Sequence, residues 1–266
     1  MATTSRTEVI ASIRHPLLKD IRRAVARGTL TEDGCCVAES FHLLEEAIRS
    51  ECRIRAVLAA ASVRTAVEGH VRGLRLRVAV VEDAAFAELS STQTSQGVIT
   101  LVKPPVWTLE NLFRPRAMVV VLDGVQDPGN AGTVVRAAEA FGATGLLFLR
   151  GTVSPYNPKT LRASAGSVFR MPLVAGLDPT LARAALEQKR LDLYAAQPQG
   201  QKNLHEADLT RGFALVIGNE ARGVSARLRS GALDLRIPVR GVESLNAAMA
   251  AGIILYEASR QRMLKR

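Results

Sequence analysis

The chain has 266 residues, of which 47% are hydrophobic and 23% charged, so it can bury one large core or two ordinary ones and need not be disordered. It contains no uncharged apolar run of about eighteen residues, and its N-terminal segment lacks the apolar stretch of a signal peptide. We therefore expect a cytoplasmic protein with no membrane association. The cysteines Cys35, Cys36 and Cys52 form no C-x-x-C pair and have no histidine at ligand spacing, so neither a disulfide framework nor a metal site is predicted.

The net charge of +10 is concentrated in residues 111–266, which hold 21 Lys and Arg against 12 Asp and Glu. A basic domain attracts polyphosphate ligands, and RNA is the expected partner. The alternative is a generally basic composition, because 29 of the basic residues are Arg and 6 are Lys. Aromatic residues make up only 4%, which argues against a surface that binds RNA by stacking on bases.

In the first half of the chain, the apolar spacing predicts a helix over residues 8–27. Its cluster of Arg22, Arg23 and Arg27 is either a solvated face or an RNA contact. A compact α/β module is expected to follow, with strands at 35–40, 54–60, 74–81 and 97–102 and helices at 41–50 and 62–70. Residues 103–116 contain three prolines and no periodicity, which predicts a linker.

In the second half, apolar strands alternate with helical patterns. Strands are expected at 117–122, 145–149, 171–175, 191–195, 213–217 and 233–237, and helices at 131–141, 158–167, 179–189, near 225 and at 245–262. This alternation predicts a mostly parallel sheet covered by helices on both faces.

Three polar segments, 122–143, 215–225 and 237–262, each follow an apolar strand. In an open α/β sheet, ligands bind outside the carboxyl ends of the strands. The three segments are therefore expected to share one pocket.

The first polar segment begins with DGVQDPGN (123–130), whose turn-forming residues join a strand to a helix. If Val134, Ala138 and Phe141 face the core, Arg136 is rotated about 200° away from them and leaves it. A surface pair with Glu139 is the simpler explanation of this arginine. The segment lacks both the G-x-G-x-x-G pattern and the P-loop pattern, so dinucleotide or ATP binding is not predicted.

The other two segments place polar residues beside glycine and at the start of the last helix. GNEARG (218–223) holds Glu220 in a glycine-framed loop, and Ser244 is a natural N-cap for the helix, whereas capping does not account for Asn246. An apolar stripe along this helix indicates core packing or a homodimer seam; its members are Leu245, Ala248, Met249, Gly252, Ile253 and Tyr256.

Together and in this order, the segments resemble the SpoU (TrmH-like) family of RNA ribose 2′-O-methyltransferases of the SPOUT superfamily, over roughly residues 117–262. VAESFHLLEEAI (37–48) and LSSTQTSQGVITLV (89–102) resemble the L30e-like substrate-binding domain of its ribosomal RNA members. The resemblance implies an L30e-like α/β domain at 1–103 with a basic N-terminal helix and a linker at 104–116. A mostly parallel SPOUT domain at 117–266 would follow, with a C-terminal trefoil knot that periodicity cannot reveal.

In such enzymes the loops of the knot hold S-adenosylmethionine, and two subunits build each active site. The implied cofactor-binding residues are Ile217, Gly218, Asn219, Gly223, Ile237, Pro238, Val239, Ser244, Leu245 and Ala248. The implied residues of the methyl-transfer site are Asn130, Arg136, Glu220, Ser244 and Asn246.

The implied reaction is an in-line attack of a ribose 2′-hydroxyl on the sulfonium methyl group, which requires alignment of the reacting atoms and a proton acceptor. A guanidinium is always charged in a protein, so we expect Arg136 to clamp a phosphate and stabilise the developing alkoxide. Glu220 is either the base or a residue that binds backbone groups, and the proton acceptor stays open.

We therefore expect a metal-free homodimer that methylates RNA, with 23S ribosomal RNA as its substrate. The alternatives are a tRNA 2′-O-methyltransferase and a non-catalytic RNA-binding or ribosome-assembly factor with the same fold.

Overall fold

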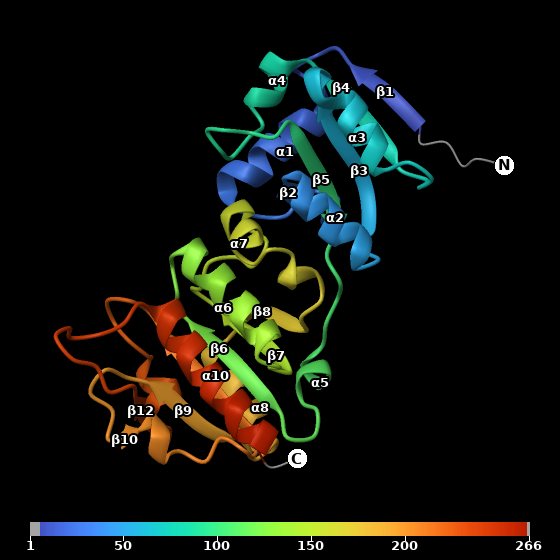
Figure 1. The fold of residues 1–266 in the computed structure, drawn as a ribbon. Helices are drawn as coiled ribbons and strands as arrows, with labels where there is room; N and C mark the ends of the chain where they lie inside the picture. Colours follow the sequence, from blue (N-terminus) through green and yellow to red (C-terminus); the bar gives the residue numbers. More distant parts are fainter. Residues whose placement is uncertain (1–5, 265–266) are drawn as a thin grey trace. The chain divides into compact units, whose positions relative to one another are not determined.

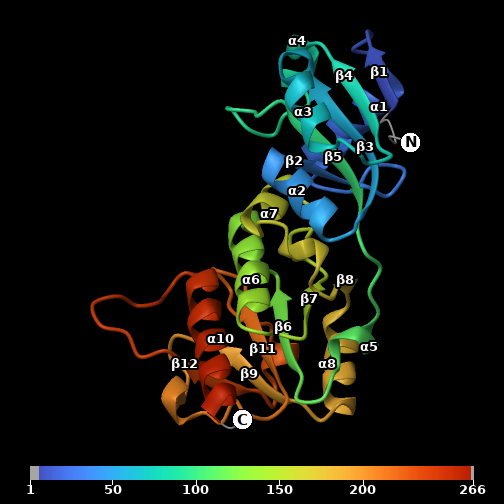
Figure 2. The ribbon, with the colours of Figure 1, turned by 45° about the vertical axis from the view of Figure 1, so that its right-hand side comes forward.

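The computed structural model describes residues 6–264 (Figure 1). Residues 1–5 and 265–266, which the predicted ranges 1–103 and 117–266 include, lie outside the described residues. The chain forms two compact units, which Figure 2 shows from a second direction. Unit 1 consists of Met1–Pro105 and Tyr156–Arg170, and unit 2 of Val106–Pro155 and Met171–Arg266.

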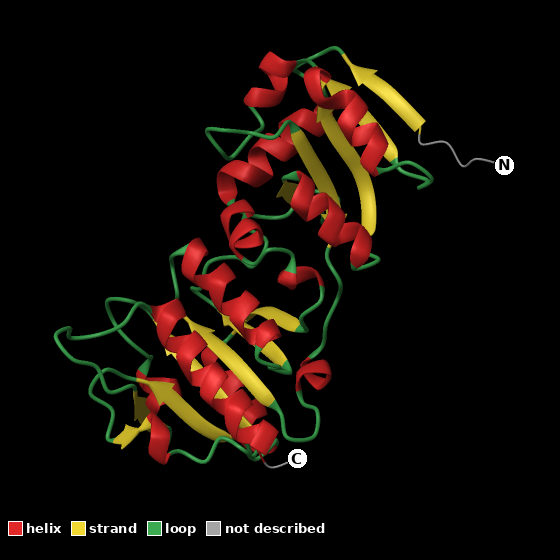
Figure 3. Ribbon diagram, in the orientation of Figure 1, coloured by secondary structure: helices red, strands yellow, loops and turns green. Residues whose placement is uncertain are grey.

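Unit 1 is built on a five-stranded mixed sheet in the order β1-β4-β3-β5-β2. Figure 3 draws its strands in yellow and the helices in red. The pairs β1–β4 and β4–β3 are parallel, and β3–β5 and β5–β2 are antiparallel. The strands are β1 (Arg6–Ile10), β2 (Cys36–Glu39), β3 (Arg53–Ala60), β4 (Arg77–Val81) and β5 (Val98–Lys103). The helices are α1 (Pro16–Arg27), α2 (Phe41–Arg49), α3 (Arg64–His70), α4 (Asp83–Ala87) and α7 (Pro158–Ala163), with 3-10 turns η1 (Ala61–Val63) and η2 (Ser167–Phe169).

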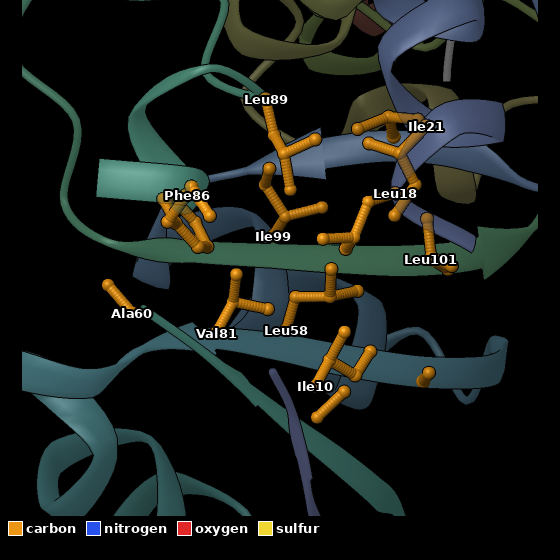
Figure 4. Close-up of a cluster of buried hydrophobic side chains, with 14 of the residues drawn as sticks. Ile10, Leu18, Ile21, Leu58, Ala60, Val81, Phe86, Leu89, Ile99 and Leu101 are labelled. Carbon is orange, nitrogen blue, oxygen red and sulfur yellow. The ribbon is translucent and has the colours of Figure 1, made fainter. Parts of the chain in front are cut away.

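Successive side chains of a strand point to opposite faces, and unit 1 covers both faces of its sheet. Figure 4 shows one of the two cores, where α1 and α4 pack against strand residues; it includes Leu18, Ile21, Leu58, Val81, Phe86 and Ile99. The alternate residues of the same strands pack with α2 and α3; this second core includes Leu44, Val57, Val67, Val78 and Val98. The α/β module predicted from the sequence is therefore confirmed.

The predicted helix over residues 8–27 is wrong at its beginning. Residues 8–10 belong to β1, whose backbone pairs with β4, and helix α1 begins only at Pro16. Proline suits the first helical position, and the Nδ1 atom of His15 accepts a hydrogen bond from the backbone N–H of Leu17. The helix therefore starts at a local capping signal, downstream of the apolar residues that suggested an earlier start.

Unit 2 has a seven-stranded sheet in the order β10-β12-β9-β11-β6-β7-β8, and every strand pair in it is parallel. Its strands are β6 (Met118–Asp123), β7 (Gly145–Leu149), β8 (Leu173–Leu177), β9 (Asp192–Ala196), β10 (Lys202–Asn203), β11 (Phe213–Gly218) and β12 (Leu233–Arg236). Its helices are α5 (Leu109–Leu112), α6 (Pro128–Ala140), α8 (Pro179–Gln188), α9 (Ala226–Arg229) and α10 (Ala247–Leu264), with a 3-10 turn η3 (Leu204–Glu206).

Helices α6 and α10 pack along each other on one face of this sheet, and α8 covers the other face (Figure 2). The predicted parallel sheet with helices on both faces is confirmed. The short strand β10 was not predicted, because two residues carry no periodic signal.

The division of the structure differs from the predicted one in two places. The predicted linker 104–116 contains the short helix α5. The predicted helix 158–167 ends at Ala163, and it packs against β2 in unit 1 although it lies inside the range 117–266. Leu161 and Thr160 are fully buried there, so this segment is part of the folded body of unit 1.

Candidate functional site

The carboxyl ends of β9, β11 and β12 meet at one edge of the unit 2 sheet, because the three strands are parallel neighbours. The residues that follow them, together with the start of α10, enclose a cavity of about 580 Å³. Its walls come from Ala196–Pro198, Ile217–Gly223, Leu235, Ile237, Val239, Glu243–Ala247, Ala250 and Ile254. This volume lies in the range of about 300–1,000 Å³ that small-molecule sites occupy.

The loop after β11 is held in a tight turn by its own backbone. Asn219 N–H donates to the carbonyl of Gly223 (3.0 Å) and Gly223 N–H donates back to Asn219 (2.8 Å). A Cβ atom on Gly218 would lie 2.2 Å from the carbonyl carbon of Gly223, so only glycine fits there. The Asn219 side chain also donates to the carbonyl of Gly124 at 2.8 Å, which ties the loop to the end of β6.

Three polar side chains of the site form one hydrogen-bonded chain. Asn246 Nδ2 donates to Asn130 Oδ1 at 3.0 Å, and Asn130 Nδ2 donates to Glu220 Oε1 at 3.1 Å. At the other end, Asn246 Oδ1 accepts hydrogen bonds from the backbone N–H groups of Ala248 (2.9 Å) and Met249 (3.3 Å). The donors thus run in one direction, from the N-terminus of α10 to the carboxylate of Glu220. These bonds bring side chains of the three polar segments together. The predicted shared pocket is confirmed only for the second and third segments, because no residue of the first segment, 122–143, lines the cavity.

The prediction that Ser244 caps the last helix is wrong. Helix α10 begins at Ala247, and the residue before it, Asn246, accepts the backbone N–H groups of the first turn. Asparagine is among the strongest N-cap residues, so this one side chain both caps the helix and binds Asn130. Ser244 is exposed and contributes to the cavity wall.

Arg136 stands apart from the other four residues. It is exposed on α6, as predicted, and it does not line the cavity. Within residues 6–264 its side chain makes no hydrogen bond or ion pair. Helical geometry places it about 9 Å along the axis and about 120° around it from Asn130. Within a single subunit, Asn130, Glu220, Ser244 and Asn246 therefore lie together, but Arg136 does not join them.

Most of the residues expected to bind the cofactor lie on the cavity wall. They are Ile217, Gly218, Asn219, Gly223, Ile237, Val239, Ser244 and Leu245. Pro238 and Ala248 do not line it, because Pro238 faces outward and Ala248 lies on the buried side of α10.

The sequence interpretation missed the loop after β9, where Gln197 and Pro198 line the cavity. The signal was present, since QPQG (197–200) follows an apolar strand in the same way as the other polar loops. It also missed two charged residues of the wall, Arg222 and Glu243.

Within residues 6–264, no three or more His, Cys, Asp or Glu side chains gather in a way that would hold a metal ion. No helix in this described part of the chain has the length and apolar character needed to cross a membrane.

Comparisons with known proteins give consistent matches. The model of the SpoU rRNA Methylase family matches residues 117–256, and that of the MRM3-like substrate binding domain matches residues 16–100. The chain is 30% identical over 249 residues to the 23S rRNA guanosine-2′-O-methyltransferase RlmP of Bacillus subtilis, covering 93% of this chain and 97% of that one. It is 32% identical over 195 residues to a 23S rRNA uridine-2′-O-methyltransferase of Streptomyces viridochromogenes, covering 70% and 68% of the two chains.

The fold is also similar to a solved structure, the SpoU methyltransferase AviRb from Streptomyces viridochromogenes in complex with the cofactor AdoMet. The TM-score is 0.86 at 27% identity, and the match covers 94% of this chain and 99% of that one.

Proposed function

The chain belongs to the SpoU rRNA methylase family, and we propose that it transfers a methyl group from S-adenosylmethionine to a ribose 2′-hydroxyl of 23S ribosomal RNA. The observation that carries the proposal is the cavity at the strand ends, where Glu220 is joined through Asn130 to Asn246. The two relatives described above are named for different bases, guanosine and uridine, so the proposal specifies the ribose and leaves the base open.

The cavity suits S-adenosylmethionine in size and in the chemistry of its walls. Ile217, Leu245 and Ile254 offer apolar surface to an adenine ring, while the glycine-framed loop lets backbone groups approach the ligand closely. Glu243 is a carboxylate on the wall that can pair with the amino group of the ligand. When bound, S-adenosylmethionine supplies a methyl group on a positively charged sulfur atom, open to in-line attack by an oxygen.

Glu220 is the proposed proton acceptor. Within the described part of the chain, Asn130 is its only hydrogen-bond partner, which leaves Oε2 able to accept the proton of a hydroxyl group. Asn246 fixes the direction of the Asn130 amide, because the Asn130 oxygen is already engaged. The amide chain therefore orients the carboxylate without consuming its second oxygen.

We assign Arg136 to the site of a second subunit. Its permanent charge suits it to clamp an RNA phosphate and to stabilise the developing alkoxide. It is exposed on α6, which packs along α10, and α10 presents Met249 (56% exposed), Ile253 (37%) and Tyr256 (56%) to solvent. These three residues, four and three positions apart, form an apolar stripe on one helix face. A homodimer through this stripe would cover it and bring each Arg136 towards the partner's cavity.

Several finer points of the family comparison extend the proposal. Unit 1 would be the L30e-like domain that binds the RNA substrate, as the matched substrate-binding model suggests. The segment around the cavity would form the trefoil knot, and the reaction would need no metal. Cytoplasmic location likewise stays a prediction.

Methyl transfer from radiolabelled S-adenosylmethionine to unmodified ribosomal RNA and tRNA, followed by alkaline hydrolysis, tests the function. A blocked 2′-hydroxyl cannot attack its phosphate, so we expect the label in alkali-resistant dinucleotides from ribosomal RNA. Label in mononucleotides would mean base methylation, and label on tRNA alone would favour the tRNA alternative. Cofactor binding without transfer to either RNA would contradict the proposed substrates, and absence of cofactor binding would favour the non-catalytic alternative.

A further inference from the structure

Residues 156–170 connect β7 to β8 of unit 2, yet they fold as part of unit 1. The chain therefore passes between the units three times. Two arginines of this segment meet carboxylates that unit 1 buries: Arg162 approaches Glu39, and Arg170 donates to Glu46. The side chains of the two glutamates are only 3% and 4% exposed.

Glu39 organises a surface loop, residues 90–96 (SSTQTSQ), that has no apolar side chain to bury. Its carboxylate accepts hydrogen bonds from the backbone N–H of Ser91 (2.9 Å) and from four hydroxyl groups, those of Ser90, Ser91, Thr92 and Ser95. Burial alone would raise the pKa of Glu39, but the hydrogen bonds from the loop outweigh it and lower the pKa. The loop is therefore held by an ionised, buried carboxylate.

Arg162 also contacts this loop, at Ser91. Its Nη1 atom donates to Ser91 Oγ at 2.6 Å and lies 3.6 Å from Glu39 Oε2. The hydroxyl of Ser91 thus accepts from Arg162 while it donates to Glu39. Through this serine the loop is linked to the segment that leads into β8.

Residues 156–170 pack closely against α1 and α2 at two glycines. A Cβ atom on Gly28, at the end of α1, would lie 2.4 Å from Nδ2 of Asn157. A Cβ atom on Gly166 would lie 2.6 Å from Cβ of Glu46. Both glycines have positive φ angles (63° and 84°), so side chains are excluded there by conformation as well as by space.

We propose that Arg162 is a positioning residue that fixes the 90–96 loop of unit 1 for contact with RNA. The exposed amide and hydroxyl groups of Gln93 and Thr94 are suited to hydrogen-bond with unpaired bases or 2′-hydroxyls. Fixing the loop before binding lowers the entropic cost of ordering it. The inference rests on the proposed function, because the loop can make this contact only if RNA is the substrate.

The test is the Arg162→Met substitution in the full chain, which keeps an unbranched side chain but removes its donors and charge. We expect amide hydrogens of residues 90–97 to exchange about 10-fold faster, since the amides of Ser91, Thr92 and Gly97 bond to side chains of this network. We also expect the KM for RNA to rise about 10-fold, as for loss of one charge-assisted hydrogen bond, with kcat and cofactor affinity nearly unchanged. Arg162→Lys should restore part of both effects.

Arg64→Met is the matched control, because Arg64 is an exposed arginine of the same unit that pairs with Glu68 on its own helix. It should change neither readout. If Arg162→Met does not fold, Ser91→Ala breaks the same link with a smaller change, and faster exchange in the rest of the loop is again expected.

Unchanged exchange in the loop would overturn the proposal. Faster exchange with an unchanged KM would overturn the RNA contact, while methylation by the unmodified chain would leave the proposed function intact. If the unmodified chain transfers no methyl group, the proposed function fails instead, and the exchange measurement still decides whether Arg162 holds the loop.

Discussion

Two loops of this protein each contain a glutamate carboxylate, and the two carboxylates have different environments, one buried and one exposed. Glu39 is buried and accepts five hydrogen bonds from the 90–96 loop. Glu220 is exposed in the glycine-framed loop and accepts one, from Asn130. A carboxylate whose oxygens are all engaged holds structure, whereas one with a free oxygen is able to take a proton. The same residue type is thus committed to stability in unit 1 and available for chemistry in unit 2.

The Glu220→Gln substitution should have the largest effect on activity. If Glu220 is the base, kcat should fall about 10²- to 10⁴-fold, because an amide cannot take the proton. Its exposed position predicts a nearly unchanged melting temperature. Single-turnover methyl transfer and thermal unfolding of the same sample provide both values, and retained activity would remove Glu220 from the proton-transfer step.

The matching substitution, Glu39→Gln, should have the opposite signature. An amide nitrogen would face loop donors, so we expect the free energy of unfolding at pH 7 to fall by about 1–3 kcal/mol. Because the pKa of Glu39 is lowered on folding, its stabilisation is present above the unfolded pKa of about 4.3 and is lost as pH falls through the folded value. Urea unfolding from pH 7 to pH 3 should therefore show a shallower acid dependence in the variant, and an identical slope would contradict this role.

Asn246 allows helix capping to be separated from the orientation of Glu220. Asn246→Ala removes both, and should cost about 0.5–2 kcal/mol of stability. Asn246→Asp keeps the cap but cannot donate to Asn130, so stability should stay close to that of the unmodified chain while kcat falls by about 10-fold. Full activity in the aspartate variant would show that the amide chain does not orient the carboxylate.

A third carboxylate, that of Glu257 on α10, is expected to contribute less to stability than that of Glu39. Hydrogen bonds from Arg260 and Gln261 outweigh burial and lower the pKa of Glu257 to about 2. Arg260 is half exposed, so solvent screens the pair and Glu257→Gln should cost less than about 1 kcal/mol. This contribution should be present above the unfolded pKa and disappear as pH falls towards 2. If Glu257→Gln lowered the free energy of unfolding as much as Glu39→Gln, burial would not explain the difference expected between the two carboxylates.

Local sequence patterns predicted most strands and helices, because each element carries its own periodicity and its own breakers. The strand-end rule also brought Asn130, Glu220 and Asn246 to one place. What it did not reveal depends on contacts between residues far apart in the chain. The hydrogen bonds from Arg162 to Ser91 and from Arg170 to Glu46, both within unit 1, span 71 and 124 residues and leave no local trace in the sequence.

Two other differences have local causes. Ser244 and Asn246 are both good N-caps, and only the observed start of α10 distinguishes them. Strand β1 was hidden because Val9 and Ile10 also fit the helical spacing of the residues that follow.

Subunit complementation between Arg136→Ala and Glu220→Gln chains tests directly whether two subunits build each active site. If each site takes Glu220 from one subunit and Arg136 from the other, a mixed dimer carries one intact site and one doubly altered site. Two inactive preparations, unfolded and refolded together in equal amounts, should then recover about a quarter of the activity of the unmodified protein, since about half of the dimers are mixed. If mixed dimers are demonstrated by mass but no activity is recovered, the shared site is contradicted. Arg136 and Glu220 of the same subunit would then act in one site.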